Sequence, residues 1–358
     1  MSYSLSLLDK SPIADGANAA DALRFTTTLA QRAEQLGYER FWVAEHHGTP
    51  AFASSAPETV VAHLLAHTSR IRVGSGGVML QHYSPFKVAE TFKVLAALAP
   101  GRVDLGIGRG PGADRQTSYA LKPTLMDNPL MMATSDSFAS DVVDAIAWAC
   151  AEPFSDDHPF TGIRAQPLGA TAPQPWLLGS TPFTARLAAE LGLPYCFAHF
   201  FHDGEGCAET LEAYRGHFQH SRHCEKPRVS LCVWALAAPT AADAERLFVP
   251  YAHWRLDRDR THHTPFPGPV EVAARTLSAR ETQRVDQLRA VTIHGTPDTV
   301  ADALRRLAAQ HVADEIVIVT MTHDPADRVR SYELIAAAMS LASPFGACGH
   351  RSFAERVA

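Results

Sequence analysis

Three short runs hold residues whose types suit acid–base and phosphate chemistry: Ala-Glu-His-His at 44–47, Gly-Ser-Gly-Gly at 74–77 and Gly-Ile-Gly-Arg-Gly at 106–110. Each run follows directly on an apolar stretch of the kind that forms a buried strand. In parallel α/β folds, ligands bind at the carboxyl ends of the strands, where helix N-termini and loops converge. We therefore expect the three runs to meet at one end of a parallel sheet and to form a site there.

The first run offers two histidines, His46 and His47. A histidine titrates near neutral pH, so it can act as a general base or donate a hydrogen bond to a ligand. Successive side chains at a strand end point to opposite sides, so one histidine can face the ligand while its neighbour packs sideways. A pair of structural histidines that holds the loop is the alternative, and the residues alone leave both open.

The glycines of the run at 74–77 remove side chains where a flat ring could lie against the backbone. A tight bend at a barrel corner is the alternative explanation.

The run at 106–112 does not have the spacing of a dinucleotide-binding loop, because Pro111 stands where the third glycine is needed. What remains is Arg109 at a strand end, and the forked donors of an arginine suit a phosphate.

A second candidate phosphate contact follows the strand predicted at 176–178. Gly179, Ser180 and Thr181 open a predicted helix there, and they offer backbone N–H groups and two hydroxyls to an anion. An ordinary helix N-cap is the alternative for either hydroxyl.

A zinc site is one interpretation of three histidines and a cysteine at the end of the helix predicted from 205 to about 221: His217, His220, His223 and Cys224. If the helix continues through them, His217, His220 and Cys224 share one face. The sequence has no second Cys/His pair at a spacing typical of zinc sites. An exposed helix face is therefore the favoured interpretation, and no metal site is expected.

Strand-like and helix-like patterns alternate along the whole chain, which is typical of repeated βα units around a parallel sheet. The predicted strands are 4–8, 40–44, 71–76, 103–107, 176–178, 195–198, 229–235 and 315–320. Eight such strands predict an α/β fold of the (β/α)8 TIM-barrel class, in one domain over 1–358, with insertions after the fourth and seventh strands. Residues 257–290 are charged and interrupted by prolines, so we expect a mobile lid there.

The composition is that of a soluble globular protein, with 46% hydrophobic and 20% charged residues in 358. A net charge of -6 gives no basic surface for nucleic acid, and no apolar run approaches the roughly 18 residues of a membrane helix. The N-terminus lacks the features of a signal peptide, and the six cysteines are scattered. We expect a cytoplasmic protein with reduced thiols.

Taken together, these runs resemble the bacterial luciferase-like flavin-dependent monooxygenases. The resemblance is carried by Phe-Trp-Val-Ala-Glu-His-His at 41–47, Val-Gly-Ser-Gly-Gly at 73–77 and Gly-Ile-Gly-Arg-Gly at 106–110, and it extends through 176–180, 191–194 and 295–297. It implies a (β/α)8 barrel that uses reduced FMN and O2, through a flavin C4a-hydroperoxide, to oxygenate a small organic substrate such as a secondary metabolite. It also implies a separate flavin reductase that supplies the reduced cofactor, and a homodimer.

The resemblance also assigns roles to individual residues. The catalytic histidine of the family falls on His46, its non-prolyl cis peptide beneath the flavin ring falls on Gly76-Gly77, and its phosphate arginine falls on Arg109. The remaining phosphate contacts fall near Gly179, Ser180, Thr181 and Thr184. His199, just beyond the sixth predicted strand, is expected to face the ring as well.

Two alternatives remain within this family. F420-dependent enzymes share the barrel, and some members are non-catalytic flavin-binding proteins, although the presence of both His46 and Arg109 favours an enzyme. Gly108 stands where luciferase has a reactive cysteine, so light emission is not implied. An oxygenase pocket must exclude water, and the aromatic residues that could line it are Phe52, Phe197, Phe200, Phe201 and Trp234.

Overall fold

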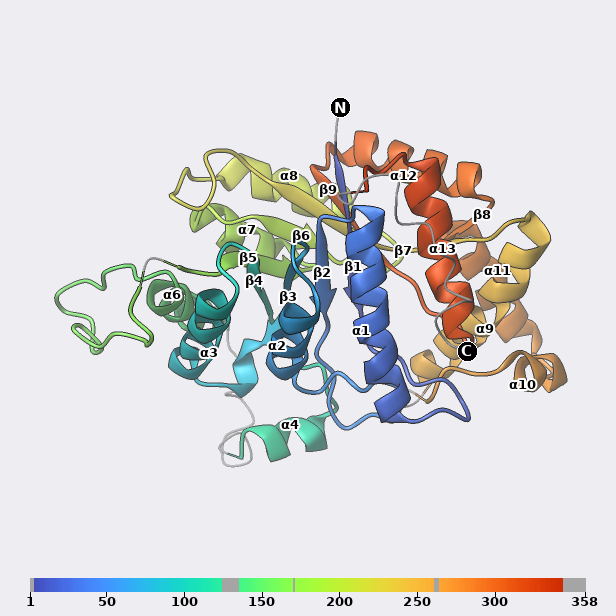
Figure 1. Ribbon diagram of the computed structural model, residues 1–358, viewed down its shortest axis with the longest axis horizontal. Coiled ribbons are helices and arrows are strands. Elements are labelled where there is room, and N and C mark those ends of the chain that lie inside the picture. The colour runs from blue at the N-terminus through green and yellow to red at the C-terminus, as the bar shows by residue number, and fades with distance from the viewer. Residues whose placement is uncertain (1–2, 124–134, 170, 261–263, 344–358) are drawn as a thin grey trace.

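Eight parallel strands close into a barrel in the computed structural model, which describes residues 3–123, 135–169, 171–260 and 264–343 (Figure 1). Each strand pairs with the next, β6 pairs with β7, and β9 returns to pair with β1. The (β/α)8 class predicted from the sequence is confirmed. The barrel strands are β1 (Ser4–Asp9), β2 (Arg40–Val43), β3 (Arg72–Met79), β4 (Val103–Gly108), β5 (Gln174–Gly179), β6 (Tyr195–Phe197), β7 (Val229–Ala237) and β9 (Glu315–Val319).

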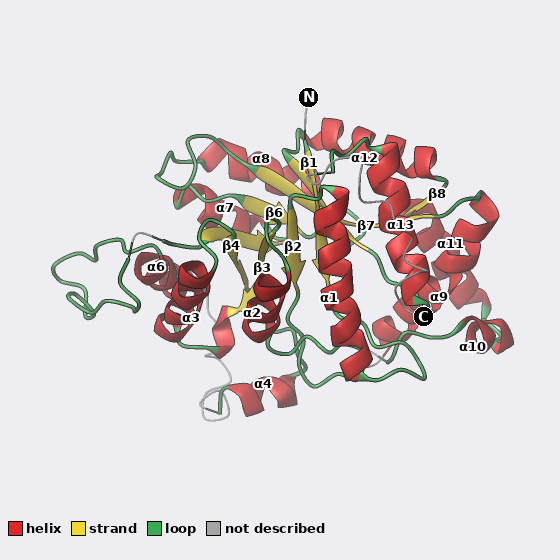
Figure 2. Ribbon diagram, viewed as in Figure 1, coloured by secondary structure: helices red, strands yellow, loops and turns green. Residues whose placement is uncertain are grey.

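Helices surround the barrel and cover its outer face (Figure 2). Their ends follow local signals: the Asn18 side chain caps the start of α1, and Gly37 ends that helix with a left-handed φ of 86°. The helices that follow barrel strands directly are α1 (Ala19–Leu36), α2 (Pro57–His67), α3 (Pro85–Leu98), α7 (Pro182–Glu190), α8 (Cys207–His217) and α13 (Pro325–Ala338). Among the described residues, no helix combines the length and the apolar character needed to span a bilayer.

The two predicted insertions are present, and both hold more regular structure than expected. After β4 come α4 (Arg115–Leu121) and α6 (Ser135–Ala149); after β7 come α9 (Ala241–Arg260), α10 (Pro269–Ala274), α11 (Ala279–Val291), β8 (Ile293–Gly295) and α12 (Pro297–His311). The segment expected to be a mobile lid, 257–290, contains α10 and most of α11, and its movement as a lid stays a prediction. A capping box at Ser278 and Glu281 begins α11.

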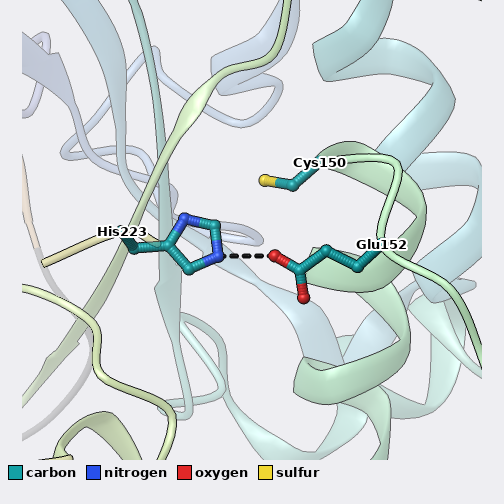
Figure 3. A group of neighbouring side chains, drawn as sticks. All are labelled: Cys150, Glu152 and His223. Carbon is teal, nitrogen blue, oxygen red and sulfur yellow. Dashed lines mark hydrogen bonds and ion pairs between the residues drawn. The ribbon is translucent and has the colours of Figure 1, made fainter. Parts of the chain in front are cut away.

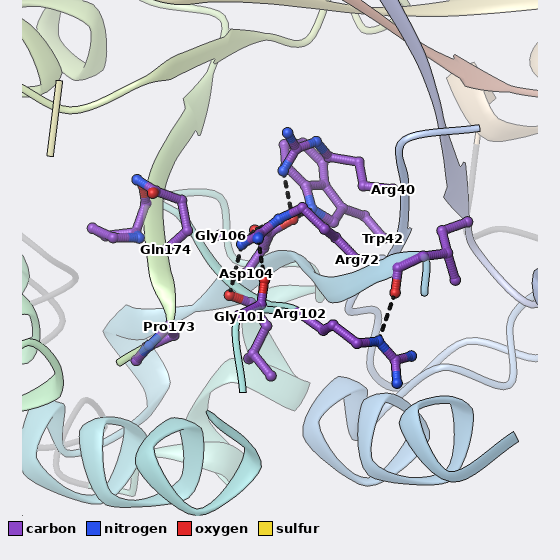
Figure 4. Close-up of polar contacts among 12 residues, drawn as sticks. Arg40, Trp42, Arg72, Gly101, Arg102, Asp104, Gly106, Pro173 and Gln174 are labelled. Atoms are coloured by element: carbon purple, nitrogen blue, oxygen red, sulfur yellow. Dashed lines mark hydrogen bonds and ion pairs between the residues drawn. The ribbon is translucent and has the colours of Figure 1, made fainter. Parts of the chain in front are cut away.

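The floor of the barrel, at the amino ends of the strands, is a charged layer that we call the charged floor: Arg40, Arg72, Asp104, Arg228 and Glu315. Arg40 bridges the two carboxylates: its guanidinium lies 2.7 Å from Asp104, a contact drawn in Figure 4. It also lies 2.6 Å from Glu315, and all three side chains are buried. Burial alone would raise the pKa of Asp104, but Arg40 and Arg72 hold it below its usual value. The layer above is apolar and includes two tryptophans, Trp42 and Trp176, in edge-to-face contact.

Strands β3 and β4 approach so closely that glycine is needed on both. A methyl group at Gly74 would lie 2.2 Å from the carbonyl oxygen of Asp104, and one at Gly106 would lie 2.2 Å from that of Ser75. These separations are far below van der Waals contact. Barrel packing therefore accounts for at least part of the glycine run at 74–77.

Candidate active site

The sequence-predicted site residues lie at the carboxyl ends of four neighbouring strands. His46 follows β2, Gly76 and Gly77 lie in β3, Arg109 follows β4, and Ser180 follows β5. Met79 is paired with Gly108, and Gly108 is paired with Leu178, so these strand ends are adjacent at one edge of the barrel. This edge is the mouth, opposite the charged floor.

The side chain of Arg109, which follows β4, lies next to the first turn of α7. The central guanidinium carbon of Arg109 is 4.8 Å from the ring centroid of Phe183, which is in the first turn of that helix. Thr181 occupies the N-cap position, but its side chain makes no capping hydrogen bond; its hydroxyl lies 3.3 Å from that of Thr184. The N-cap alternative is thus not realised by Thr181. The first-turn N–H groups and Arg109 together can hold an anion such as a phosphate.

Two further residues with hydroxyl groups, Ser180 and Thr184, lie next to this phosphate cradle of Arg109 and the first turn of α7. Ser180 is half-buried between the end of β5 and the helix. Thr184 is buried and packs back against Gly179, where a methyl group would lie only 3.0 Å from the Thr184 side chain. Glycine at 179 therefore lets α7 begin close to the strand end.

The two histidines after β2 diverge, as side-chain alternation predicts. The ring of His46 lies 4.4 Å from that of Phe52. His47 turns the other way: its Nε2 is 2.7 Å from Oε1 of Glu45, and its ring is edge-on to His82 at 6.0 Å. His47 is therefore part of a hydrogen-bonded network, whereas His46 belongs to an aromatic wall.

Glu45 is the centre of that network, and sequence reasoning gave it no role. Its side chain is fully buried and accepts hydrogen bonds from the Tyr83 hydroxyl at 2.8 Å and from the Met79 backbone N–H at 3.0 Å, besides its contact with His47. Burial, and then the Glu45 charge, raise the pKa of Tyr83 well above its usual value, so this hydroxyl stays a donor. The network joins the segment after β2 to the end of β3 and to the turn that precedes α3.

The Gly76–Gly77 peptide is cis, as the resemblance implied. A methyl group at Gly76 would lie 2.6 Å from the Leu8 side chain, and one at Gly77 would lie 2.7 Å from the carbonyl oxygen of Gly106. Both glycines therefore satisfy the packing of the barrel. Their contact with a flavin ring stays a prediction.

His199 lies on the turn after β6, and its ring packs against Gly204, where a methyl group would be 2.4 Å from its Nε2. Burial, and then the nearby His311, lower the pKa of His199, with Asp203 acting in the opposite direction. These neighbours place the ring towards α12 and the turn before α8. Its position opposite a flavin ring stays a prediction.

The expected aromatic residues divide between the mouth and the core. Phe52 lies beside His46 and 5.9 Å from Trp254, which in turn lies 6.3 Å from Phe266. Trp234 is buried and stacks on Tyr251 at 4.0 Å. Residues Trp254 and Phe266 come from α9 and the segment after it, so the second insertion contributes to the wall around His46.

The remaining expected aromatics have other surroundings. Phe197 belongs to the core between the barrel and its helices, so it does not line the mouth as expected. Phe201 is half exposed at 49%, and Phe200 carries the Lys10 ammonium 4.6 Å from its ring centroid.

The helix face considered for zinc does not form. The predicted helix 205–221 ends at His217, so His220 and Cys224 lie beyond it and do not share a face with that residue. The chain turns instead at Ser221, whose hydroxyl accepts the backbone N–H groups of His223 and Cys224.

The sequence matches the profile of the luciferase-like monooxygenase family over residues 1–315. Among similar proteins is the uncharacterized protein YwcH of Bacillus subtilis, 42% identical over 94% of this chain and 99% of that protein. Another, from the same organism, is named N-acetyl-S-alkylcysteine monooxygenase and is 34% identical over 94% of this chain and 98% of its own length.

Solved structures agree with these similarities. The crystal structure of apo-MsnO8 superimposes with a TM-score of 0.84 at 34% identity, covering 96% of this chain and all 100% of that one. Two more distant structures share the fold. The oxygenating constituent of 3,6-diketocamphane monooxygenase from Pseudomonas putida, in complex with FMN, superimposes with a TM-score of 0.69 at 21% identity, covering 96% of this chain and 100% of that one. An F420-dependent secondary alcohol dehydrogenase superimposes with a TM-score of 0.65 at 16% identity, covering 94% of this chain and 99% of that one. The chain belongs to the luciferase-like monooxygenase family.

Proposed function

We propose that the protein is a flavin-dependent monooxygenase that uses reduced FMN and O2 to oxygenate a small organic substrate. The observation that carries this proposal is the phosphate cradle of Arg109 and the first turn of α7, on the same barrel edge as His46. FMN joins a flat ring to one phosphate, and the mouth offers a glycine-lined strand end beside a cationic helix N-terminus.

The residues of the mouth divide the work. Reduced FMN, when bound, supplies the electrons that activate O2. Arg109 and the α7 N-terminus bind and orient its phosphate, and His46 holds or moves a proton at the reacting end. The aromatic wall of Phe52, Trp254 and Phe266 excludes water from that end.

Several features of the proposal rest on the family rather than on these contacts. A separate reductase supplies reduced FMN, and the chain acts as a homodimer in the cytoplasm. The relative named N-acetyl-S-alkylcysteine monooxygenase supports a small organic molecule as the substrate class.

The phosphate cradle can be tested by anaerobic titration with reduced FMN. Replacing Arg109 by alanine should weaken binding by about 2 to 4 kcal/mol, because a charge-assisted hydrogen bond is lost in a partly desolvated site. Arg115→Ala is the matched control, since Arg115 lies on α4 and its guanidinium is hydrogen-bonded to Tyr119. Equal affinity in wild type and Arg109→Ala would rule out the cradle, and tight binding of F420 with none of FMN would favour the alternative cofactor.

The role of His46 is tested by product yield. His46→Ala should lose about 10² to 10⁴ in rate while it keeps most of its affinity for reduced FMN. His47→Ala should instead cost mainly stability, because His47 is bonded to the buried Glu45. An unchanged yield in His46→Ala would show that the protein binds flavin without using this histidine.

A further inference from the structure

Three side chains that can bind a metal ion meet on the amino-end side of the barrel: Cys150, Glu152 and His223 (Figure 3). Their donor atoms all lie within 4.8 Å of one another, and Nε2 of His223 is 2.7 Å from Oε1 of Glu152. Cys150 is buried, while His223 and Glu152 are only partly exposed. The three donors are therefore largely shielded from solvent, and Glu152 is the most accessible of them.

The backbone holds the three donors in place. Cys150 and Glu152 follow the end of α6, and Ala151 between them adopts a left-handed φ of 56°. The N–H of Glu152 bonds the carbonyl of Ala147, a pattern that closes helices and turns the chain back on itself. This turn directs the side chains at 150 and 152 to the same side of the chain.

His223 comes from a different segment, the connection between α8 and β7. Ser221 fixes that connection: its hydroxyl donates to the carbonyl of Gly192 and accepts the N–H of His223 at 2.9 Å. The histidine is thus presented from a constrained loop rather than from a mobile one.

The donor set suits a borderline-soft divalent ion. A thiolate, a carboxylate and a neutral imidazole balance the charge of a divalent cation, and sulfur with nitrogen favours Zn²⁺ over Mg²⁺ or Ca²⁺. Tetrahedral zinc separates such donors by roughly 3.3 to 3.6 Å, so small side-chain rotations from the present positions suffice. Burial, and then the Glu152 charge, raise the pKa of the Cys150 thiol to about 12, while Arg222 and Lys93 act in the opposite direction. A metal ion bound here would therefore have to displace the thiol proton.

We propose that Cys150, Glu152 and His223 form a zinc site, with water as the fourth ligand. The site would join the end of α6 to the loop that precedes β7, two segments that are far apart in the sequence. It lies at the opposite end of the barrel from the mouth, so it acts on stability and stands independently of the proposed oxygenase activity.

The test uses the full chain, dialysed against a chelator and titrated anaerobically with Co²⁺. One equivalent of Co²⁺ should produce the near-ultraviolet charge-transfer band of a thiolate–cobalt bond, and added Zn²⁺ should remove the band. Cys150→Ser should abolish the band, and His223→Gln should weaken metal affinity by at least about tenfold. Zn²⁺ should raise the melting temperature of the wild type, should raise that of His223→Gln by less, and should leave that of Cys150→Ser unchanged.

Matched controls separate this site from other histidines and thiols. Cys224→Ser changes a half-buried thiol one residue from His223 and should keep the band. The pair His63 and His67 on α2, whose ring centroids are 4.0 Å apart, can bind a cation but provides no thiolate. Absence of the band in wild type, or its persistence in Cys150→Ser, would overturn the proposal, and far-UV circular dichroism verifies that each variant is folded.

Discussion

The buried carboxylate of Glu45 should be needed to hold the mouth together, and Glu45→Gln tests this with almost no change in shape. The carboxylate accepts three hydrogen bonds, from His47 and Tyr83 on Oε1 and from the Met79 N–H on Oε2. A glutamine can accept the first two with its oxygen, but its NH2 group then faces the Met79 N–H, and two donors oppose each other.

The cost follows from these contacts. A buried N–H left without an acceptor costs about 1 to 3 kcal/mol, and each bond that loses its charged acceptor weakens by about 1 kcal/mol. The expected loss in the free energy of unfolding is therefore about 3 kcal/mol, with a range of roughly 2 to 5. With an m-value of about 3 kcal/mol/M, the urea midpoint should fall by about 1 M.

Urea unfolding followed by tryptophan fluorescence measures this shift. Glu39→Gln is the control, because Glu39 is exposed and directly precedes β2. Tyr83→Phe removes one of the three donors, so the double variant should lose less than the sum of the single losses. A midpoint for Glu45→Gln within about 0.2 M of wild type would refute the reasoning, because the carboxylate would then carry no net hydrogen-bond energy.

Three other results are expected. Gly106→Ala should lose about 3 kcal/mol or more in urea unfolding, since its methyl group would meet a β3 carbonyl oxygen at 2.2 Å, whereas Gly108→Ala, with its nearest atom at 3.4 Å, should lose little. Ala151→Gly should raise the melting temperature, because a left-handed φ costs a non-glycine residue about 1 kcal/mol. Burial lowers the pKa of His82 and of His253, so the folded state favours their neutral forms. The free energy of unfolding should therefore fall as the pH drops below about 6.5, by up to about 1.4 kcal/mol per pH unit for each histidine. A urea midpoint that stays constant between about pH 7 and 5.5 would contradict this.

The sequence predicted the barrel because strand and helix periods alternate clearly, and all eight barrel strands lie where the apolar stretches indicated. It did not reveal β8, since a strand of three residues, two of them partly exposed and the third a buried glycine, carries no pattern. It also predicted no helix within 257–290, because α11 is strongly polar and buries only Val285 and Leu288 along its length. Short and polar elements are specified by their caps and neighbours rather than by periodicity.

The candidate site was predictable where its residues follow strand ends in sequence. Arg109 and the start of α7 could be paired from the strand order of a barrel, and the divergence of His46 and His47 follows from side-chain alternation. The role of Tyr83 could not be predicted, because it reaches Glu45 across 38 positions in sequence. The cluster of Cys150, Glu152 and His223 could not be predicted either, because Glu152 and His223 are separated by 71 positions in the sequence. The left-handed conformation of Ala151, which brings Cys150 and Glu152 to the same side, also gives no signal in a sequence.

The charged floor has a consequence for how the chain folds as it is synthesised. A chain completed only through β7 carries Arg40, Arg72 and Arg228 against the single carboxylate of Asp104, because Glu315 belongs to the last barrel strand. Unpaired guanidinium groups resist leaving water, so the barrel interior should stay hydrated until that strand arrives. Synthesis of β9 thus supplies the Glu315 carboxylate as well as the strand that closes the barrel. The interior should therefore lose its water only near the end of translation, and not gradually as each strand is made.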